Sequence, residues 1–189
     1  YHAQPISCKD CGPTISLYNN KNECLSRDSE AIQQISHLIN EGKIVAIKGL
    51  GGFHLICDAT IDETVLELRV RKNRPTKPLA VMFKNLNEIR EFALLSKEEE
   101  DIISSKEKPI TLVTTKKNSN LSKHIAPNID RLGVFIAYTP LHKLLFNYLN
   151  NPIVATSANL SDEPIIVHKD EILFKLNNIV DYVLDINRK

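Results

Sequence analysis

Apolar residues occur along this chain in two patterns, helical spacing and uninterrupted runs, which together predict alternating helices and strands. After Ser29, apolar side chains three or four positions apart predict a helix that ends at Gly42. Uninterrupted apolar runs predict buried strands at 44–47, 53–57, 79–83, 110–113, 132–137 and 153–155. The alternation favours an α/β fold: a single domain with a twisted, mixed sheet flanked by helices.

The remaining helices carry their own start signals. Thr60–Glu63 and Ser96–Glu99 have the spacing of a capping box, in which a hydroxyl residue and a glutamate satisfy each other's backbone amides. Other elements are expected at 86–94 (helix), 97–105 (helix), 141–149 (helix), 169–177 (helix) and 179–186 (strand). Residues 116–130 are polar, and we expect them to form a mobile loop, a candidate lid.

Residues 1–27 are polar and irregular apart from a short strand expected at 14–18. They contain Cys8-Lys9-Asp10-Cys11, a knuckle that can be half of a zinc site or a redox pair. A redox pair normally begins a helix, which Gly12-Pro13 disfavours, whereas zinc requires a second pair that this sequence lacks. We therefore expect residues 1–27 to be the remnant of a zinc-finger segment and a linker. Residues 28–189 would form the compact domain, and the chain would be a fragment of a longer protein.

The most concentrated charge lies between Arg69 and Lys77, where five basic residues fall within nine positions of a chain whose formal net charge is only +1. Pro75 and Pro78 stiffen the second half of this run, so Arg74 and Lys77 cannot belong to an ordinary solvated helix. Basic side chains on a stiff loop that leads into a buried strand suit a compact phosphate anion. The alternative is a solvated basic loop with no ligand.

The composition indicates the cellular compartment and argues against some classes of binding partner. The chain of 189 residues is long enough for one well-buried core. Few aromatic residues and no tryptophan argue against a stacking platform for single-stranded nucleic acid. The sequence shows no membrane-spanning run and no signal peptide, so we expect a cytoplasmic protein without a membrane partner. Cys57 lies in an apolar run and is expected to be a small buried hydrophobe.

Two short motifs are candidates for ligand contact. Gly49-Leu50-Gly51-Gly52, preceded by Lys48, fits neither a dinucleotide fingerprint nor a P-loop. Its glycines still indicate a tight backbone, which is equally consistent with a ligand and with a plain turn. Thr156-Ser157-Ala158-Asn159 follows an apolar strand, where hydroxyl and amide groups can bind a ligand or form a cap or Asx-turn.

A third motif, Tyr138-Thr139-Pro140-Leu141-His142, places a proline at the expected first residue of a helix. His142 stands one step beyond an apolar position, which is more typical of a structural histidine than of a general base. The sequence has no HExxH motif, no pair of histidines at metal-binding spacing and no supported Ser/His/Asp order, so hydrolase or metalloenzyme chemistry is poorly supported.

Together these motifs resemble a YrdC-type domain, whose pattern is K-x-R in a basic loop and S-x-N much later. Here these are Lys72-Asn73-Arg74 and Ser157-Ala158-Asn159. More closely, the chain resembles the YrdC-like domain of the HypF family of hydrogenase maturation carbamoyltransferases. This closer resemblance rests on Tyr1–Pro5 with Cys8 and Cys11, Lys48–Leu55, Arg74–Met82, Tyr138–His142 and Thr156–Pro164. It covers nearly the whole chain, in the family's order.

Two positions depart from that family. Asp162 stands where the family more often has glycine, and Ala137 where it often has proline. Both neighbour expected ligand loops and put the shape and charge of those loops in doubt.

The resemblance implies that ATP and carbamate, the latter released elsewhere from carbamoyl phosphate, form carbamoyl adenylate and pyrophosphate. It implies catalytic roles for Lys72, Arg74 and Lys48. The implied nucleotide-binding residues are Lys72, Arg74, Lys77, Thr156, Ser157 and Asn159. The implied substrate-binding residues are Lys48, Gly51, Gly52 and His54. Mg²⁺ would bridge phosphates, and Zn²⁺ would bind Cys8 and Cys11 only with the missing cysteine pair.

The implied partners are the flanking domains of the same polypeptide and a hydrogenase maturation protein that receives the carbamoyl group. Two alternatives stay open. One is a threonylcarbamoyl-AMP synthase for tRNA modification, which would use threonine and bicarbonate. The other is an RNA-binding module, which the near-neutral charge and low aromatic content make unlikely.

Overall fold

The computed structural model describes residues 12–160 and 163–187. Within them lies one ten-stranded mixed sheet with the strand order β2-β1-β10-β3-β4-β9-β5-β8-β7-β6. The strands are β1 Ile15–Asn19, β2 Cys24–Arg27, β3 Val45–Lys48, β4 Phe53–Asp58, β5 Ala80–Phe83, β6 Ala93–Leu94, β7 Thr111–Thr115, β8 Arg131–Ile136, β9 Ile153–Ser157 and β10 Tyr182–Ile186. The helices are α1 Asp28–Asn40, α2 Asp62–Arg71, α3 Leu86–Phe92, α4 Lys97–Ser104, α5 Pro140–Leu145 and α6 Lys169–Lys175. No helix in this described part is long and apolar enough to cross a membrane.

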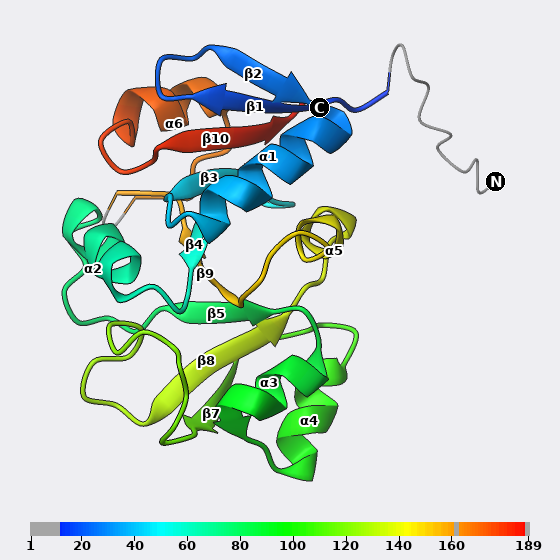
Figure 1. Ribbon diagram of the computed structural model, residues 1–189, viewed down its shortest axis with the longest axis vertical. Helices are drawn as coiled ribbons and strands as arrows, with labels where there is room; N and C mark the ends of the chain where they lie inside the picture. Colours follow the sequence, from blue (N-terminus) through cyan, green and yellow to red (C-terminus); the bar gives the residue numbers. More distant parts are fainter. Residues whose placement is uncertain (1–11, 161–162, 188–189) are drawn as a thin grey trace.

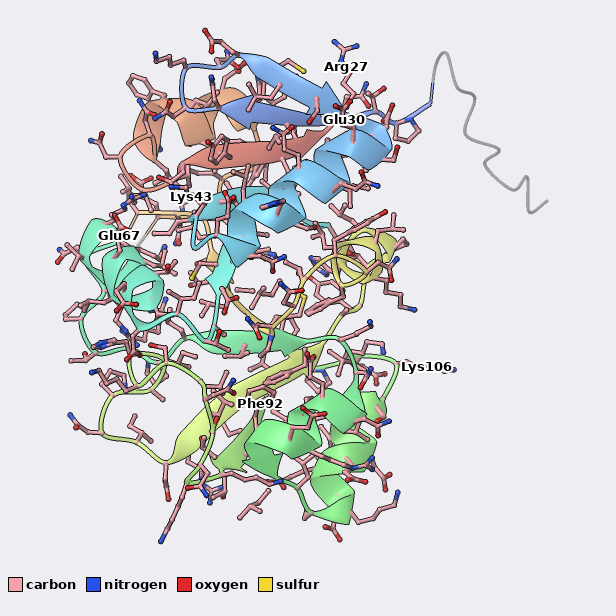
Figure 2. The ribbon with its side chains drawn as sticks, viewed as in Figure 1. Arg27, Glu30, Lys43, Glu67, Phe92 and Lys106 are labelled. Carbon is pink, nitrogen blue, oxygen red and sulfur yellow. The ribbon has the colours of Figure 1, made fainter. Side chains whose placement is uncertain are left out.

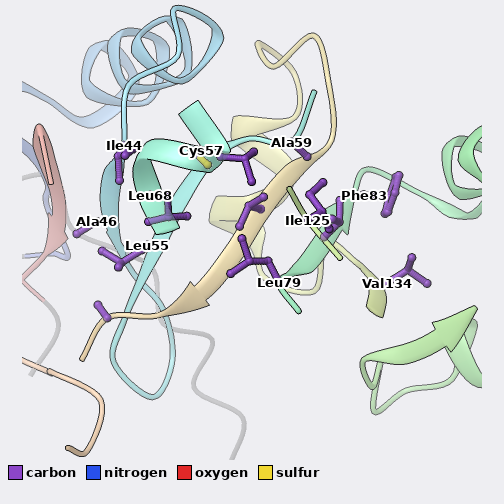
Figure 3. Packing of buried hydrophobic residues seen from close by; sticks show 14 of the residues in the cluster. Ile44, Ala46, Leu55, Cys57, Ala59, Leu68, Leu79, Phe83, Ile125 and Val134 are labelled. Atoms are coloured by element: carbon purple, nitrogen blue, oxygen red, sulfur yellow. The ribbon is translucent and has the colours of Figure 1, made fainter. Parts of the chain in front are cut away.

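Helices cover both faces of the sheet because successive side chains of a strand point to opposite faces. On one face, Ile44 and Ala46 of the β3 region pack in a cluster with apolar side chains of α2, α3, α4 and α6. Figure 3 shows part of this cluster around Leu55, Cys57 and Leu68. On the other face, Val45 and Ile47 pack with side chains of α1 and α5. Figure 1 shows α3 and α4 at one end of the twisted sheet, beside β7 and β8, and α1 near the opposite end. The expected α/β domain with a mixed sheet flanked by helices is confirmed.

The strand expected at 14–18 is present as β1, and the sheet also contains β2, which was not expected. β1 pairs with β10, the last strand, and β2 pairs with β1, so residues 15–19 and 24–27 form one edge of the sheet. Part of the segment that we assigned to a linker is therefore sheet, and the boundary expected at residue 28 is corrected. Leu17 of β1 is fully buried in the cluster that includes α1 side chains. β1 also pairs with β10 near the other end of the described chain, a contact between distant segments that local polarity does not reveal.

The two expected capping boxes had different outcomes. Ser96 and Glu99 form the reciprocal pair that begins α4. Thr60 does not cap α2, because its hydroxyl instead donates to Asp58 Oδ1 at 2.6 Å and the helix begins after Ile61. The helix therefore begins without a side-chain cap, at Asp62.

The loop expected to be a lid is tied to the core at 122–125. Ser122 Oγ donates to Asp62 Oδ1 of α2 at 2.6 Å, and Leu79 N donates to the carbonyl oxygen of Ile125 at 2.9 Å. The Ile125 side chain is buried. These contacts give the loop a structural role against α2 and the start of β5, which corrects the lid expectation.

Candidate functional site

The K-x-R loop joins α2 to β5 and reaches the end of β9, which lies between β4 and β5 in the sheet. There the ammonium of Lys72 donates to the carbonyl oxygens of Ser157 and Asn159, each at 2.8 Å, and to Asn159 Oδ1 at 3.0 Å. Ser157 Oγ donates to the same amide oxygen at 2.7 Å. The structure thus joins the two halves of the K-x-R…S-x-N pattern into one site.

Arg74 contributes the second cation of this site. Its guanidinium donates to Thr156 Oγ1 at 3.3 Å, to the Pro78 carbonyl oxygen at 2.7 Å and to the Lys77 carbonyl oxygen at 3.3 Å. Lys77 itself is exposed beside them. The structure therefore brings Lys72, Arg74 and Thr156 together at the end of β9, where a planar, permanently charged guanidinium can make paired contacts with phosphate oxygens.

A buried arginine that the sequence analysis did not select supports this loop. The Arg69 side chain is only 4 % exposed. It donates to the carbonyl oxygens of Arg74 at 2.8 Å, Lys77 at 3.2 Å and Ile125 at 3.0 Å, and also to that of His124. Arg69 follows Val65 by four positions, so its place on the apolar side of the helix was the available signal.

Positive charge at this site has no acidic counterpart among residues 12–160 and 163–187. No salt bridge there involves Arg69, Lys72, Arg74 or Lys77. Burial, with the nearby charges of Arg74 and Lys77, lowers the pKa of Lys72 from 10.5 to about 8. An anion bound between these groups would relieve both the desolvation and the repulsion.

This electrostatic state predicts that phosphate binding depends on pH. A bound polyanion favours protonated Lys72, so binding should take up a proton where free Lys72 is partly neutral, near and above pH 8. We expect the affinity for ATP to fall roughly tenfold between pH 7 and pH 9, since Lys72 loses its proton across that range. Titration calorimetry in buffers of different ionisation enthalpy measures the number of protons taken up when ATP binds. The variant Lys72→Arg stays charged and should lose this dependence; an unchanged proton uptake in that variant would contradict it.

The glycine turn between β3 and β4 serves packing. Gly49 N donates to the Gly52 carbonyl oxygen at 2.8 Å, which closes the hairpin. Gly52 has a φ of +149°, and a Cβ there would lie 2.9 Å from Ile165 Cγ1 and 2.9 Å from the Ile166 carbonyl oxygen. A Cβ on Gly51 would meet nothing within 4 Å. Gly51 and Gly52 were expected to contact the substrate, which stays a prediction, and the structure shows that Gly52 lies against the segment around residues 165–166.

The turn offers a matched pair of substitutions. Gly52→Ala should lower the free energy of unfolding by about 1–3 kcal/mol, because it combines a close contact with an unfavourable φ. Gly51→Ala should change it by less than about 0.5 kcal/mol, since the added methyl group meets only open space. Urea unfolding of both variants measures the difference in their free energies of unfolding. Equal unfolding midpoints would show that Gly52 is not required for packing at this turn.

Lys48 and His54 lie on opposite faces of the sheet. His54 is the partner of Ile47 on β3 and of Ser157 on β9, so these three side chains share a face. Lys48 is the partner of Phe53, and its ammonium lies 5.0 Å from the Phe53 ring centroid and donates to the Val167 carbonyl oxygen. Because side chains alternate along each strand, Lys48 and His54 would approach a shared small substrate from opposite faces, and the expectation that both bind it stays a prediction.

The structure describes only some of the cysteine and loop positions that the sequence analysis singled out. Cys8, Cys11 and Asp162 lie outside the described residues. Within the described part of the chain, no group of three His, Cys, Asp or Glu side chains can hold a metal ion. Cys57 is fully buried as expected, and burial together with the charge of Asp58 raises the pKa of its thiol.

A cationic loop anchored at the end of a sheet strand defines an anion-binding α/β domain. Residues 37–189 match the model of the Sua5/YciO/YrdC family, described as "Telomere recombination". The chain belongs to this family. Residues 1–18 also match the model described as "HypF finger".

Relatives with higher identity are HypF proteins. The chain is 45% identical to carbamoyltransferase HypF of Synechocystis over 167 residues, which is 88% of the chain but 22% of that protein. It is 26% identical to threonylcarbamoyl-AMP synthase of Vibrio cholerae over 161 residues, which is 82% of the chain and 85% of that enzyme. The chain thus spans about a fifth of the HypF relative and most of the synthase.

Solved structures agree with this placement. A crystal structure of full-length HypF in a phosphate- and nucleotide-bound form superposes with a TM-score of 0.90 at 43% identity, covering all of this chain and 24% of that one. HypF of T. kodakarensis superposes with a TM-score of 0.93 at 37% identity, covering all of this chain and 25% of that one.

Proposed function

We propose that this domain binds ATP at the K-x-R loop and joins its adenylate to carbamate, as one part of a HypF-type carbamoyltransferase. The observation that carries the proposal is the group formed by Lys72, Arg74 and Lys77, which has no carboxylate partner within the described residues. Similarity to HypF proteins, one of them solved with nucleotide, supports the choice of ligand.

The proposed reaction needs charge and alignment more than a protein nucleophile. A carbamate oxygen attacks the α-phosphorus of ATP, the bond from that phosphorus to the β-bridging oxygen breaks, and pyrophosphate leaves. Lys72 and Arg74 would neutralise the triphosphate and the departing pyrophosphate. Thr156, Ser157 and Asn159 would orient phosphate oxygens through hydroxyl and amide groups, because these groups already surround the two cations.

Metal ions would enter this scheme in two ways. Mg²⁺ would arrive with the nucleotide, held by its phosphates, because the cationic groups of the loop are themselves poor metal ligands. The polar oxygens of Ser157 and Asn159 are the side-chain atoms there with suitable chemistry. Zn²⁺ would require Cys8 and Cys11 together with a second cysteine pair from elsewhere.

The identity of the co-substrate distinguishes the proposed carbamoyl-adenylate formation from threonylcarbamoyl-AMP synthesis. In the complete polypeptide, labelled pyrophosphate should exchange into ATP when carbamoyl phosphate is supplied, since adenylate formation is reversible. Exchange that requires threonine and bicarbonate instead would favour a threonylcarbamoyl-AMP synthase, the activity named for the 26% identical relative. Absence of exchange with either co-substrate would overturn the proposed reaction. The acceptor of the carbamoyl group would be a hydrogenase maturation protein.

A further inference from the structure

The segment between β9 and α6 carries Asn159, and backbone hydrogen bonds tie it to the sheet on both sides of that residue. Ile166 N donates to the Ala158 carbonyl oxygen at 2.9 Å, and Ala158 N donates to the carbonyl oxygen of Phe53 in β4 at 2.9 Å. These bonds fix the backbone where the segment leaves the sheet and where it returns. They do not fix the Asn159 side chain, whose orientation therefore depends on its own contacts.

The Asn159 amide has to face one way for the cationic site to form. Its oxygen accepts from Lys72 Nζ at 3.0 Å and from Ser157 Oγ at 2.7 Å, and its nitrogen donates to the Glu163 carbonyl oxygen at 2.7 Å. A flipped amide would turn N–H donors toward the Lys72 ammonium, which cannot accept them, and would set its oxygen against the Glu163 carbonyl oxygen. The Glu163 carbonyl group thus favours the orientation that Lys72 requires.

Helix α6 in turn holds Glu163. The Glu163 carboxylate pairs at 3.0 Å with Lys175, which lies in the last turn of α6. Lys175 also pairs at 3.0 Å with Glu171, one turn earlier on the same helix. Figure 1 shows α6 beside β10, and the buried side chain of Ile172 packs this helix into the core. A series of direct contacts therefore connects a packed helix with the cationic site.

We propose that Lys175 and Glu163 are positioning residues, which hold the Asn159 amide in the orientation that phosphate binding requires. This inference rests on the proposed function, because ATP is the ligand whose phosphates the site would bind. Both residues act through Asn159. With one N–H of its amide bonded to Glu163 and the oxygen bonded to Lys72, the second N–H is left to donate to a phosphate oxygen.

The signs of two substitutions separate positioning from a general effect of charge. Lys175→Met keeps an apolar stem but breaks the pair with Glu163. We expect it to raise the dissociation constant for ATP about threefold, a loss within the range of a partly exposed ion pair. Glu163→Met removes a negative charge, which by charge alone would strengthen the binding of an anion. Positioning predicts the opposite, a loss of about threefold as well.

Titration calorimetry with ATP and Mg²⁺ compares these variants with a double variant and two controls. The double variant should bind no more weakly than either single one, because both residues act through one contact. Glu171→Met removes an equal charge from α6 but leaves Lys175 bonded to Glu163, so it should not weaken binding. Lys175→Arg keeps the pair and should recover most of the affinity that Lys175→Met loses.

The side-chain amide of Asn159 gives a second readout, which requires no nucleotide. Its ¹⁵N signal should shift in Lys175→Met and in Glu163→Met but not in Glu171→Met. Stronger ATP binding by Glu163→Met, or an unchanged Asn159 signal in Lys175→Met, would overturn the positioning role and leave the proposed function intact. A wild-type chain that binds no ATP would overturn the proposed function, and with it the inference that rests on it.

Discussion

Replacing Arg74 with alanine should raise the dissociation constant for ATP by about ten- to a hundredfold, because one charged hydrogen-bonding group is worth about 1.5–3 kcal/mol. In a calorimetric titration with ATP and Mg²⁺ such a loss should leave no measurable binding. Arg74 is partly exposed and bonds chiefly to carbonyl oxygens of its own loop, so the fold should persist. Arg74→Lys keeps the charge without the planar fork and should lose less affinity.

The matched control removes an equal charge elsewhere. Lys106 is exposed in the segment after α4 and projects from the molecule (Figure 2). Lys106→Ala should bind ATP as the wild type does, since the site depends on local geometry and not on net charge. Equal affinity of Arg74→Ala and wild type would remove Arg74 from the site. A loss of the circular dichroism spectrum in Arg74→Ala would instead assign it to the fold.

Replacing Arg69 with methionine should destabilise the domain and weaken ATP binding together. Methionine keeps an unbranched apolar side chain but removes the hydrogen bonds that Arg69 donates to the carbonyl oxygens of Arg74, Lys77 and Ile125. We expect a loss of about 2–3 kcal/mol in the free energy of unfolding. For a domain of this size this corresponds to roughly 4–12 °C in Tm. The affinity for ATP should fall because the loop that carries Arg74 loses its anchor.

Arg90→Met is the control for that experiment. Arg90 pairs with Glu100 at 2.7 Å, but its side chain is 47% exposed, and exposed ion pairs contribute less than about 1 kcal/mol. Thermal unfolding of both variants measures the difference. If Arg69→Met is as stable as Arg90→Met, then Arg69 does not anchor the loop.

Much of the architecture follows from local pattern. Apolar runs and helical spacing located the core strands and five of the helices to within a few residues, because these elements bury continuous apolar side chains. Pro140 and the Ser96–Glu99 pair marked two helix starts correctly. A strand was expected close to β1, but its place in the sheet was not, since β1 pairs with β10, more than a hundred positions away. β2, which pairs with β1 at the edge of the sheet, was not expected.

The residues of the candidate site could be predicted where they belong to a sequence motif. Lys72 and Asn159 meet across 87 positions, and only the resemblance to a family joined them before the fold was known. Arg69 was missed because an arginine within a basic run is usually solvated, whereas here backbone carbonyls bury it. The register of the β3–β4 hairpin places Lys48 and His54 on opposite faces of the sheet, and this register cannot be read from residue types.

The bond that breaks in ATP tests the central claim most directly. The complete polypeptide would be supplied with carbamoyl phosphate and with ATP labelled at the γ-phosphorus, and the labelled product separated. Attack at the α-phosphorus predicts label in pyrophosphate, unlabelled AMP as its counterpart, and loss of both products in Arg74→Ala. Label that appears as orthophosphate, with ADP as the nucleotide product, would show cleavage at the γ-phosphorus and contradict adenylate formation at this site.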